Sequence, residues 1–102
     1  IDPAKIIAKH IDKTVHIHFK NVRPDIIARA RREPMPWMWS KIEGAFTVPG
    51  DGGIDFVPIL ETIKQNDWKG WIVVEAEQNP LVANPYLYAG LAREYLKDVT
   101  GI

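Results

Sequence analysis

Two apolar stretches of the sequence carry side chains that bind metals or transfer protons. One stretch ends in Glu75 and Glu77, and the other alternates His16, His18 and Lys20 with aliphatic and aromatic residues. Successive side chains of a strand point to opposite faces, so each polar set shares one face of its own strand. Imidazole and carboxylate groups at neighbouring strand ends are typical ligands of divalent metals. The pattern predicts a polar site at the carboxyl ends of two strands.

Position along the strands predicts different roles for these residues. His18 is nearer the strand end and is the better ligand, whereas His16 is one layer deeper and would orient it. The alternative is that one or both are core histidines hydrogen-bonded to their neighbours. Glu75 follows directly on an apolar run and needs a cation or several donors, unless it and Glu77 simply reach solvent. In a parallel pair we expect Glu75 level with His18, as metal ligands, and Glu77 level with Lys20, as an ion pair or substrate clamp.

Helical and strand patterns alternate along the chain. Such alternation predicts parallel strands joined by right-handed crossovers. Only two strands are visible, which is too few to close a barrel or to cover both faces of a sheet. The expected elements are a helix over 3–11, a strand over 14–20, a helix from Pro24, a connection without strong structure over 33–53, a helix following Asp55, a strand over 71–77, and a last helix that begins at Pro85 and ends just before Gly101.

The composition narrows the possible functions. The chain has 102 residues, 46% of them hydrophobic, which suits one packed domain. Its 13 basic and 13 acidic residues balance, so we expect neither nucleic acid nor a membrane surface as partner. The absence of cysteine excludes disulfides and thiolate chemistry. No signal peptide or apolar span is recognisable, so a cytoplasmic protein is expected.

Other conspicuous residues have ordinary explanations beside functional ones. The cluster Trp37, Met38 and Trp39 belongs either to the core or to a lid over a site. The glycine-rich residues 50–53 are interpreted as a turn that feeds the Asp55 cap rather than as a phosphate cradle, because no lysine follows and Asp51 would repel an anion.

Three blocks of sequence resemble a known family. The segments His16–Arg23, Phe46–Phe56 and Gly70–Pro80, the last including Val-Glu-Ala-Glu-Gln, are similar in order and spacing to the C-terminal part of the myo-inosose-2 dehydratases. That family belongs to the xylose-isomerase-like barrels. The resemblance implies an α/β fold in which residues 1–102 form the C-terminal portion, about two βα units, of a single (β/α)8 TIM barrel domain.

The same resemblance implies a metal-dependent lyase that dehydrates a keto-inositol to a cyclic dione. His18 and Glu75 match the last two of four family ligands to a divalent metal, Mn²⁺ or Co²⁺, and the first two would lie outside this chain. Glu75, Lys20 and Glu77 would be catalytic. Arg23 and His16 would contact the substrate, a small keto-sugar or polyol. The fragment alone would be inactive, and a homo-oligomer is expected.

Departures from the superfamily pattern keep alternatives open. The stretch Gly44–Phe46 has no ligands where endonuclease relatives bind further metals, which disfavours DNA repair, and Asn21 stands where the dehydratases are expected to have Asp. A sugar isomerase or epimerase shares the enediol chemistry. A non-catalytic fragment that assembles through open sheet edges is the other alternative. The chain begins at Ile1 within a helical pattern, which suggests a piece of something longer.

Overall fold

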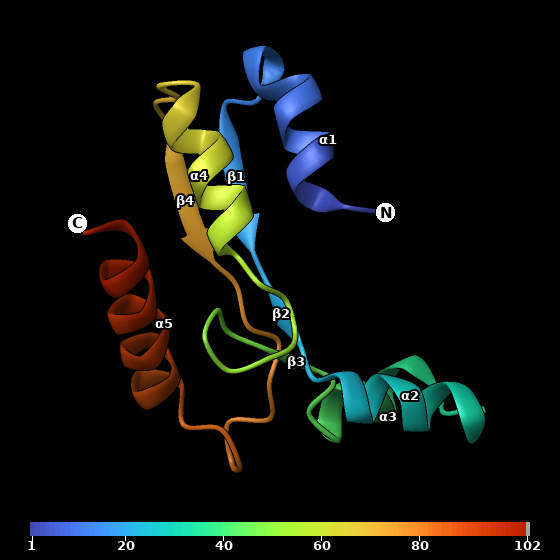
Figure 1. Cartoon of the computed structure of the whole chain (residues 1–102). Coiled ribbons are helices and arrows are strands. Elements are labelled where there is room, and N and C mark those ends of the chain that lie inside the picture. Colours follow the sequence, from blue (N-terminus) through green and yellow to red (C-terminus); the bar gives the residue numbers. More distant parts are fainter. Residues whose placement is uncertain (102) are drawn as a thin grey trace.

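The computed structural model describes residues 1–101 as a mixed α/β arrangement with two small sheets (Figure 1). The predicted alternation of helices and strands is confirmed, although both main strands are shorter than expected. The elements are α1 (Pro3–His10), a 3₁₀ turn (Ile11–Lys13), β1 (His16–Phe19), β2 (Asn21–Val22), α2 (Pro24–Arg32), α3 (Trp37–Ile42), β3 (Phe46–Thr47), α4 (Val57–Gln65), β4 (Trp71–Val74) and α5 (Pro85–Thr100).

The helix boundaries follow from local capping chemistry. Asp2 accepts a hydrogen bond from the amide of Ala4 at the start of α1, and Asn84 caps α5 in the same way. Proline follows each cap at the first helical position, where its missing N–H costs nothing. Gly101 ends α5 in the left-handed conformation, with φ of 74°, which glycine adopts without strain. These ends agree with the sequence predictions.

The main sheet pairs β1 with β4 in parallel, as predicted. His16 lies opposite Trp71 and Phe19 lies opposite Val74, and the amide of Glu75 continues the ladder by donating to the carbonyl of Phe19 at 2.9 Å. Paired residues of parallel strands point to the same side of the sheet. The polar alternate residues of both segments therefore share one face.

The opposite face of this sheet packs against helices. The buried core contains Phe19 of β1 together with Phe56 and residues of α4, and α1 packs against the same cluster. Within the described residues, the two-stranded sheet has helices α1 and α4 on its apolar face (Figure 1). Its polar face carries the exposed His16 and His18. The fold thus separates a packing face from a chemical face.

The segment 33–53 is more ordered than predicted. The expectation of a connection without strong structure was wrong, because helix α3 and strand β3 form within it. β3 pairs antiparallel with β2, the short strand that follows β1 in the chain. Pro34 and Pro36 interrupt the helical pattern, but the residues from Trp37 to Ile42 contain neither Pro nor Gly and complete a short helix. The segment 33–53 extends beyond the carboxyl end of β1 (Figure 1).

Asn21 of β2 anchors the end of the segment 33–53 through hydrogen bonds of its side chain. Its side chain is fully buried, and its Oδ1 accepts hydrogen bonds from the amides of Val22 at 2.8 Å and Ile54 at 2.9 Å. Removing a side-chain oxygen that accepts from two partly buried amides is destabilising, because both donors lose their partner. Gly52 leaves the room for this arrangement, since a Cβ there would lie 2.5 Å from Asn21 and from the carbonyl of Val22.

None of the helices described over residues 1–101 is long and apolar enough to cross a membrane.

Gly52→Ala should destabilise the full-length protein by about 1–3 kcal/mol, because the new methyl group collides with the side chain of Asn21 and with the carbonyl of Val22. Gly90→Ala is the matched control. A Cβ at Gly90, inside α5, meets nothing within 4 Å, so this change should stabilise the helix by about 0.5–1 kcal/mol. Urea unfolding of both variants measures the difference. Equal effects of the two substitutions would contradict the claim that Gly52 leaves room for the Asn21 side chain.

Candidate metal and polyol site

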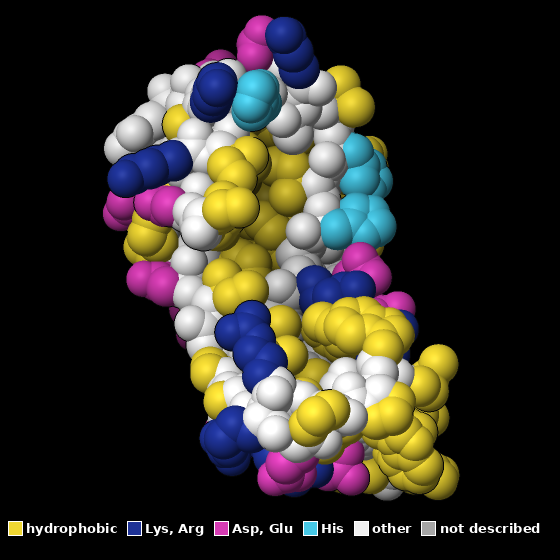
Figure 2. Space-filling view, turned by 90° about the vertical axis from the view of Figure 1, so that its right-hand side faces the viewer, with side chains coloured by type: hydrophobic (Ala, Val, Ile, Leu, Met, Phe, Trp, Pro, Cys, Tyr) yellow, Lys and Arg dark blue, Asp and Glu magenta, His cyan; other side chains and the backbone are white. Residues whose placement is uncertain are grey.

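Five polar side chains gather on the polar face of the main sheet and just beyond its carboxyl end: His16, His18, Lys20, Glu75 and Glu77. The histidines, then basic and acidic side chains, then a hydrophobic patch follow one another down the right-hand edge of Figure 2. The alternation inferred from the sequence therefore brings these residues together. Their roles in catalysis and in binding remain predictions.

The predicted register was wrong by two residues. We expected Glu75 level with His18, but His18 pairs with Val73, so Glu75 continues the strand opposite Lys20. The offset arises because β4 starts with Trp71 opposite His16. The His18 ring nevertheless contacts Glu75, with 3.0 Å between Nδ1 and Oε2. Glu75 consequently contacts both His18 and Lys20.

The two oxygens of Glu75 have different partners. Oε1 lies 2.6 Å from the Lys20 ammonium, and Oε2 faces Nδ1 of His18. Nε2 of His18 lies 3.2 Å from Nε2 of His16. One neutral tautomer of His18 satisfies both contacts, because Nδ1 then donates to Glu75 while Nε2 accepts from His16. The sequence-based role of His16 in orienting His18 agrees with this geometry.

The Lys20–Glu75 pair is ionised at neutral pH. The hydrogen bond from Lys20, followed by that from His18, lowers the pKa of Glu75. The same contact with Glu75 raises the pKa of Lys20, against the opposing effect of burial. Lys20 therefore remains a charged hydrogen-bond donor and is unsuited to act as a base at neutral pH.

Glu77 lies between two lysines. Its Oε1 is 3.0 Å from Nζ of Lys41, and its Oε2 is 3.3 Å from Nζ of Lys20. Lys41, ahead of Lys20, lowers the pKa of Glu77. Lys41 belongs to α3 and was missed by the sequence analysis, because nothing in a local pattern shows that α3 returns to the end of β4. Glu77 also contacts Lys20, in agreement with the predicted ion pair.

Arg23 is hydrogen-bonded to residues of the segment 33–53. Within the described chain, none of its hydrogen bonds goes to the five polar side chains of the site. Its guanidinium donates to the carbonyl of Gly44 at 2.7 Å, to Asp51 at 2.6 Å and to Thr47 at 3.1 Å. Tyr88 of α5 accepts a longer bond of 3.4 Å. These contacts give Arg23 a structural function, and substrate binding by Arg23 remains an untested prediction.

The donor atoms fit a divalent metal in kind but not in number. Among residues 1–101 no group of three or more His, Asp or Glu side chains is placed to hold an ion. His18 and Glu75 supply one nitrogen and one oxygen that lie 3.0 Å apart. Neighbouring ligands about 2.1 Å from an octahedral ion are separated by roughly that distance. The chain thus offers two ligands, and any further ligands must come from elsewhere.

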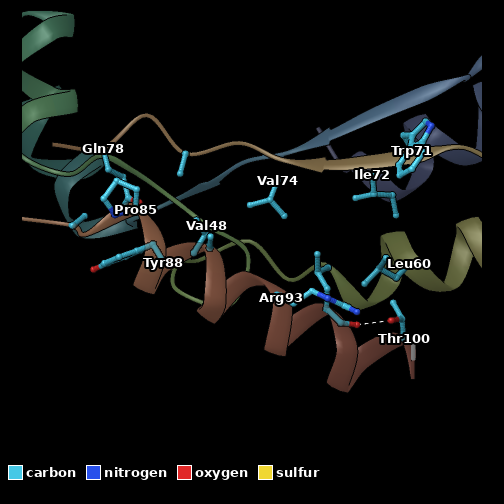
Figure 3. Close-up of a pocket in the computed structure, with 14 residues that line it drawn as sticks. Val48, Leu60, Trp71, Ile72, Val74, Gln78, Pro85, Tyr88, Arg93 and Thr100 are labelled. Atoms are coloured by element: carbon cyan, nitrogen blue, oxygen red, sulfur yellow. Dashed lines mark hydrogen bonds between the residues drawn. The ribbon is translucent and has the colours of Figure 1, made fainter. Parts of the chain in front are cut away.

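A large cavity lies on the other face of the sheet, between β4 and α5 (Figure 3). It has a volume of about 670 Å³, and its wall includes the apolar side chains of Val48, Ile72, Val74 and Leu96. A site that binds a polar ligand needs convergent polar groups. This cavity is predominantly apolar and so resembles an incompletely covered packing surface.

Comparison with known proteins identifies relatives of the chain. The chain is 50% identical over 95 residues to the inosose dehydratase of Bacillus velezensis, 46% over 95 residues to that of Geobacillus kaustophilus, and 45% over 100 residues to that of Clostridium beijerinckii. The chain is a relative of the inosose dehydratases. These alignments include 93–98% of the chain, but the chain spans only about a third of the length of these relatives. No protein-family model matches the chain.

Lys20→Met should raise the pKa of Glu75, because Lys20 is the main cause of its lowered value. The free energy of unfolding should be lower in the variant than in the wild type, with the full difference above pH 4.5, the ordinary pKa of glutamate. This difference should disappear as the pH falls through the lowered pKa of Glu75. It should fade again at high pH, as Lys20 deprotonates above 10.5.

Urea unfolding of the metal-free full-length wild type and variant across this pH range measures the difference. Lys69→Met is the control, since Lys69 pairs only with the exposed Asp67 among the described residues and should have little effect at any pH. A difference for Lys20→Met that persists unchanged to about pH 2 would contradict the assignment.

Proposed function

We propose that the full-length protein is a metal-dependent hydro-lyase that converts a keto-inositol into a cyclic dione, and that this chain supplies part of its active site. Identity of 41–50% to proteins named inosose dehydratase, over nearly all of the chain, supports this reaction. The observation that carries the site assignment is the His18–Glu75 contact of 3.0 Å at the carboxyl end of the sheet.

We propose further that the chain forms about two βα units of a (β/α)8 barrel. In such barrels the helices cover the outside, polar catalytic residues occupy the carboxyl ends of the strands, and each strand has two neighbours. The β1–β4 pair has helices on one face and polar residues on the other, and each strand retains an outer edge that is unpaired in the described part. The greater length of the relatives is sufficient to supply the remaining strands.

His18 and Glu75 would hold the divalent metal together with ligands from the rest of the protein. Mn²⁺ and Co²⁺ suit a mixed nitrogen and oxygen ligand set. When bound, the ion would act as a Lewis acid that stabilises negative charge on the substrate carbonyl oxygen. His18 would bind through Nδ1 without its proton, and its Nε2–H would then point to His16.

The dehydration removes a proton from the carbon beside the carbonyl and a hydroxyl group from the next carbon. The released hydroxyl takes up a proton and leaves as water, and the enol that remains isomerises to the dione. Lys20 is suited to donate a hydrogen bond or proton to the leaving hydroxyl, since its raised pKa keeps it charged. Glu77 is ionised and suited to accept a hydrogen bond from a neighbouring hydroxyl.

His18→Ala in the full-length protein should abolish metal loading and lower dehydratase activity by about 100-fold or more, because the ion loses one protein ligand. Metal analysis of the purified protein and the ultraviolet absorbance of the dione measure the two effects. Formation of an epimer or isomer instead of the dione would identify a different reaction on the same site.

His10→Ala is the matched control for this substitution. His10 ends α1 with an exposed side chain, so its removal should leave metal content and activity unchanged. A His18→Ala protein that retains its full metal content and activity would refute the ligand assignment.

A further inference from the structure

A hollow lies between α3 and the segment that follows β4. It has a volume of about 480 Å³, and Met38, Lys41 and Ile42 line one side while residues 76–80 line the other. Glu77 and Lys41 form an ion pair between the two sides. The hollow therefore lies next to the polar site, at the carboxyl end of the sheet, where ligands bind in parallel α/β proteins.

The hollow is connected to the proposed metal ligands by a chain of ion pairs. Lys41 contacts Glu77 at 3.0 Å, Glu77 contacts Lys20 at 3.3 Å, and Lys20 contacts Glu75 at 2.6 Å. Glu75 in turn contacts His18. Alternating charges of this kind present both donors and acceptors to a ligand that lies along them.

An exposed aromatic side chain stands beside the hollow. The Trp37 ring is 5.4 Å from Nζ of Lys41 and packs edge-on against Phe46, with ring centroids 5.1 Å apart. Lys20 lies 5.2 Å from the ring centre of Phe46. Trp37 remains 62% exposed although it belongs to this contact network. Hydrophobic side chains lie below the charged residues in Figure 2.

Trp37 differs in this respect from its neighbour Trp39. Trp39 is similarly exposed, at 58%, but takes part in no ring or cation contact among the described residues. The comparison separates an aromatic group that is joined to the charged site from one that is merely exposed on the same short helix.

We propose that Trp37, Lys41 and Glu77 form a specificity subsite for the ring of a cyclic polyol. A cyclic polyol has an apolar C–H face and a rim of hydroxyl groups. The negative face of an indole ring attracts the C–H face, while Lys41 donates to hydroxyls and Glu77 accepts from them. This inference rests on the proposed function, because it assigns these residues to the half of the substrate away from its carbonyl.

The test compares Trp37→Ala, Trp37→Phe, Lys41→Met and the control Trp39→Ala in the full-length protein. The measurements are kcat and KM for the keto-inositol, metal content, and calorimetric binding of myo-inositol, which has no carbonyl to react. Trp37→Ala and Lys41→Met should each raise KM and weaken myo-inositol binding about tenfold, with metal content unchanged. Trp37→Phe should recover much of the affinity, and Trp39→Ala should behave as the wild type.

Unchanged KM and binding in Trp37→Ala and Lys41→Met would overturn the subsite, as would an equal loss in Trp39→Ala. If Trp37→Ala fails to fold, Lys41→Met and Trp37→Phe decide the result. A wild type that binds myo-inositol through Trp37 but forms no dione would overturn the proposed function and leave the subsite supported. A wild type that binds no cyclic polyol would overturn the subsite.

Discussion

The parallel pairing of β1 with β4 is the constraint on which the rest of the site depends. It places residues 57 positions apart, His18 and Glu75, in direct contact on one face of the sheet. The apolar alternate residues of the same strands pack against α1 and α4 on the other face. A one-residue slip would exchange the two faces, so core packing and the geometry of the candidate site are specified by the same register.

Charge balance then determines what the site can do. Glu75 and Glu77 are both kept ionised by lysines, and each carboxylate divides its oxygens between two partners. A carboxylate beside an imidazole is a donor pair of the kind that binds divalent metals, whereas the adjoining lysines are suited to donate to hydroxyl groups. Under the proposed function, one end of the site would bind a cation and the other a polyol.

The sequence alone predicted those features that arise from local chemistry. Period-two alternation identified the polar faces that contain His18 and Glu75, and the caps at Asp2 and Asn84 located two helix starts. The register was predicted wrongly, because it depends on where β4 begins relative to β1. Helix α3 was also missed, since its short pattern lies between prolines, and with it the contact of Lys41 with Glu77.

The central claim is that His18 and Glu75 share a divalent cation. Anomalous diffraction at the absorption edge of manganese or cobalt, from crystals of the full-length protein loaded with that metal, tests it most directly. The account predicts one ion within about 2.0–2.3 Å of both an imidazole nitrogen of His18 and a carboxylate oxygen of Glu75. An ion bound elsewhere, with the direct His18–Glu75 hydrogen bond intact, would contradict it.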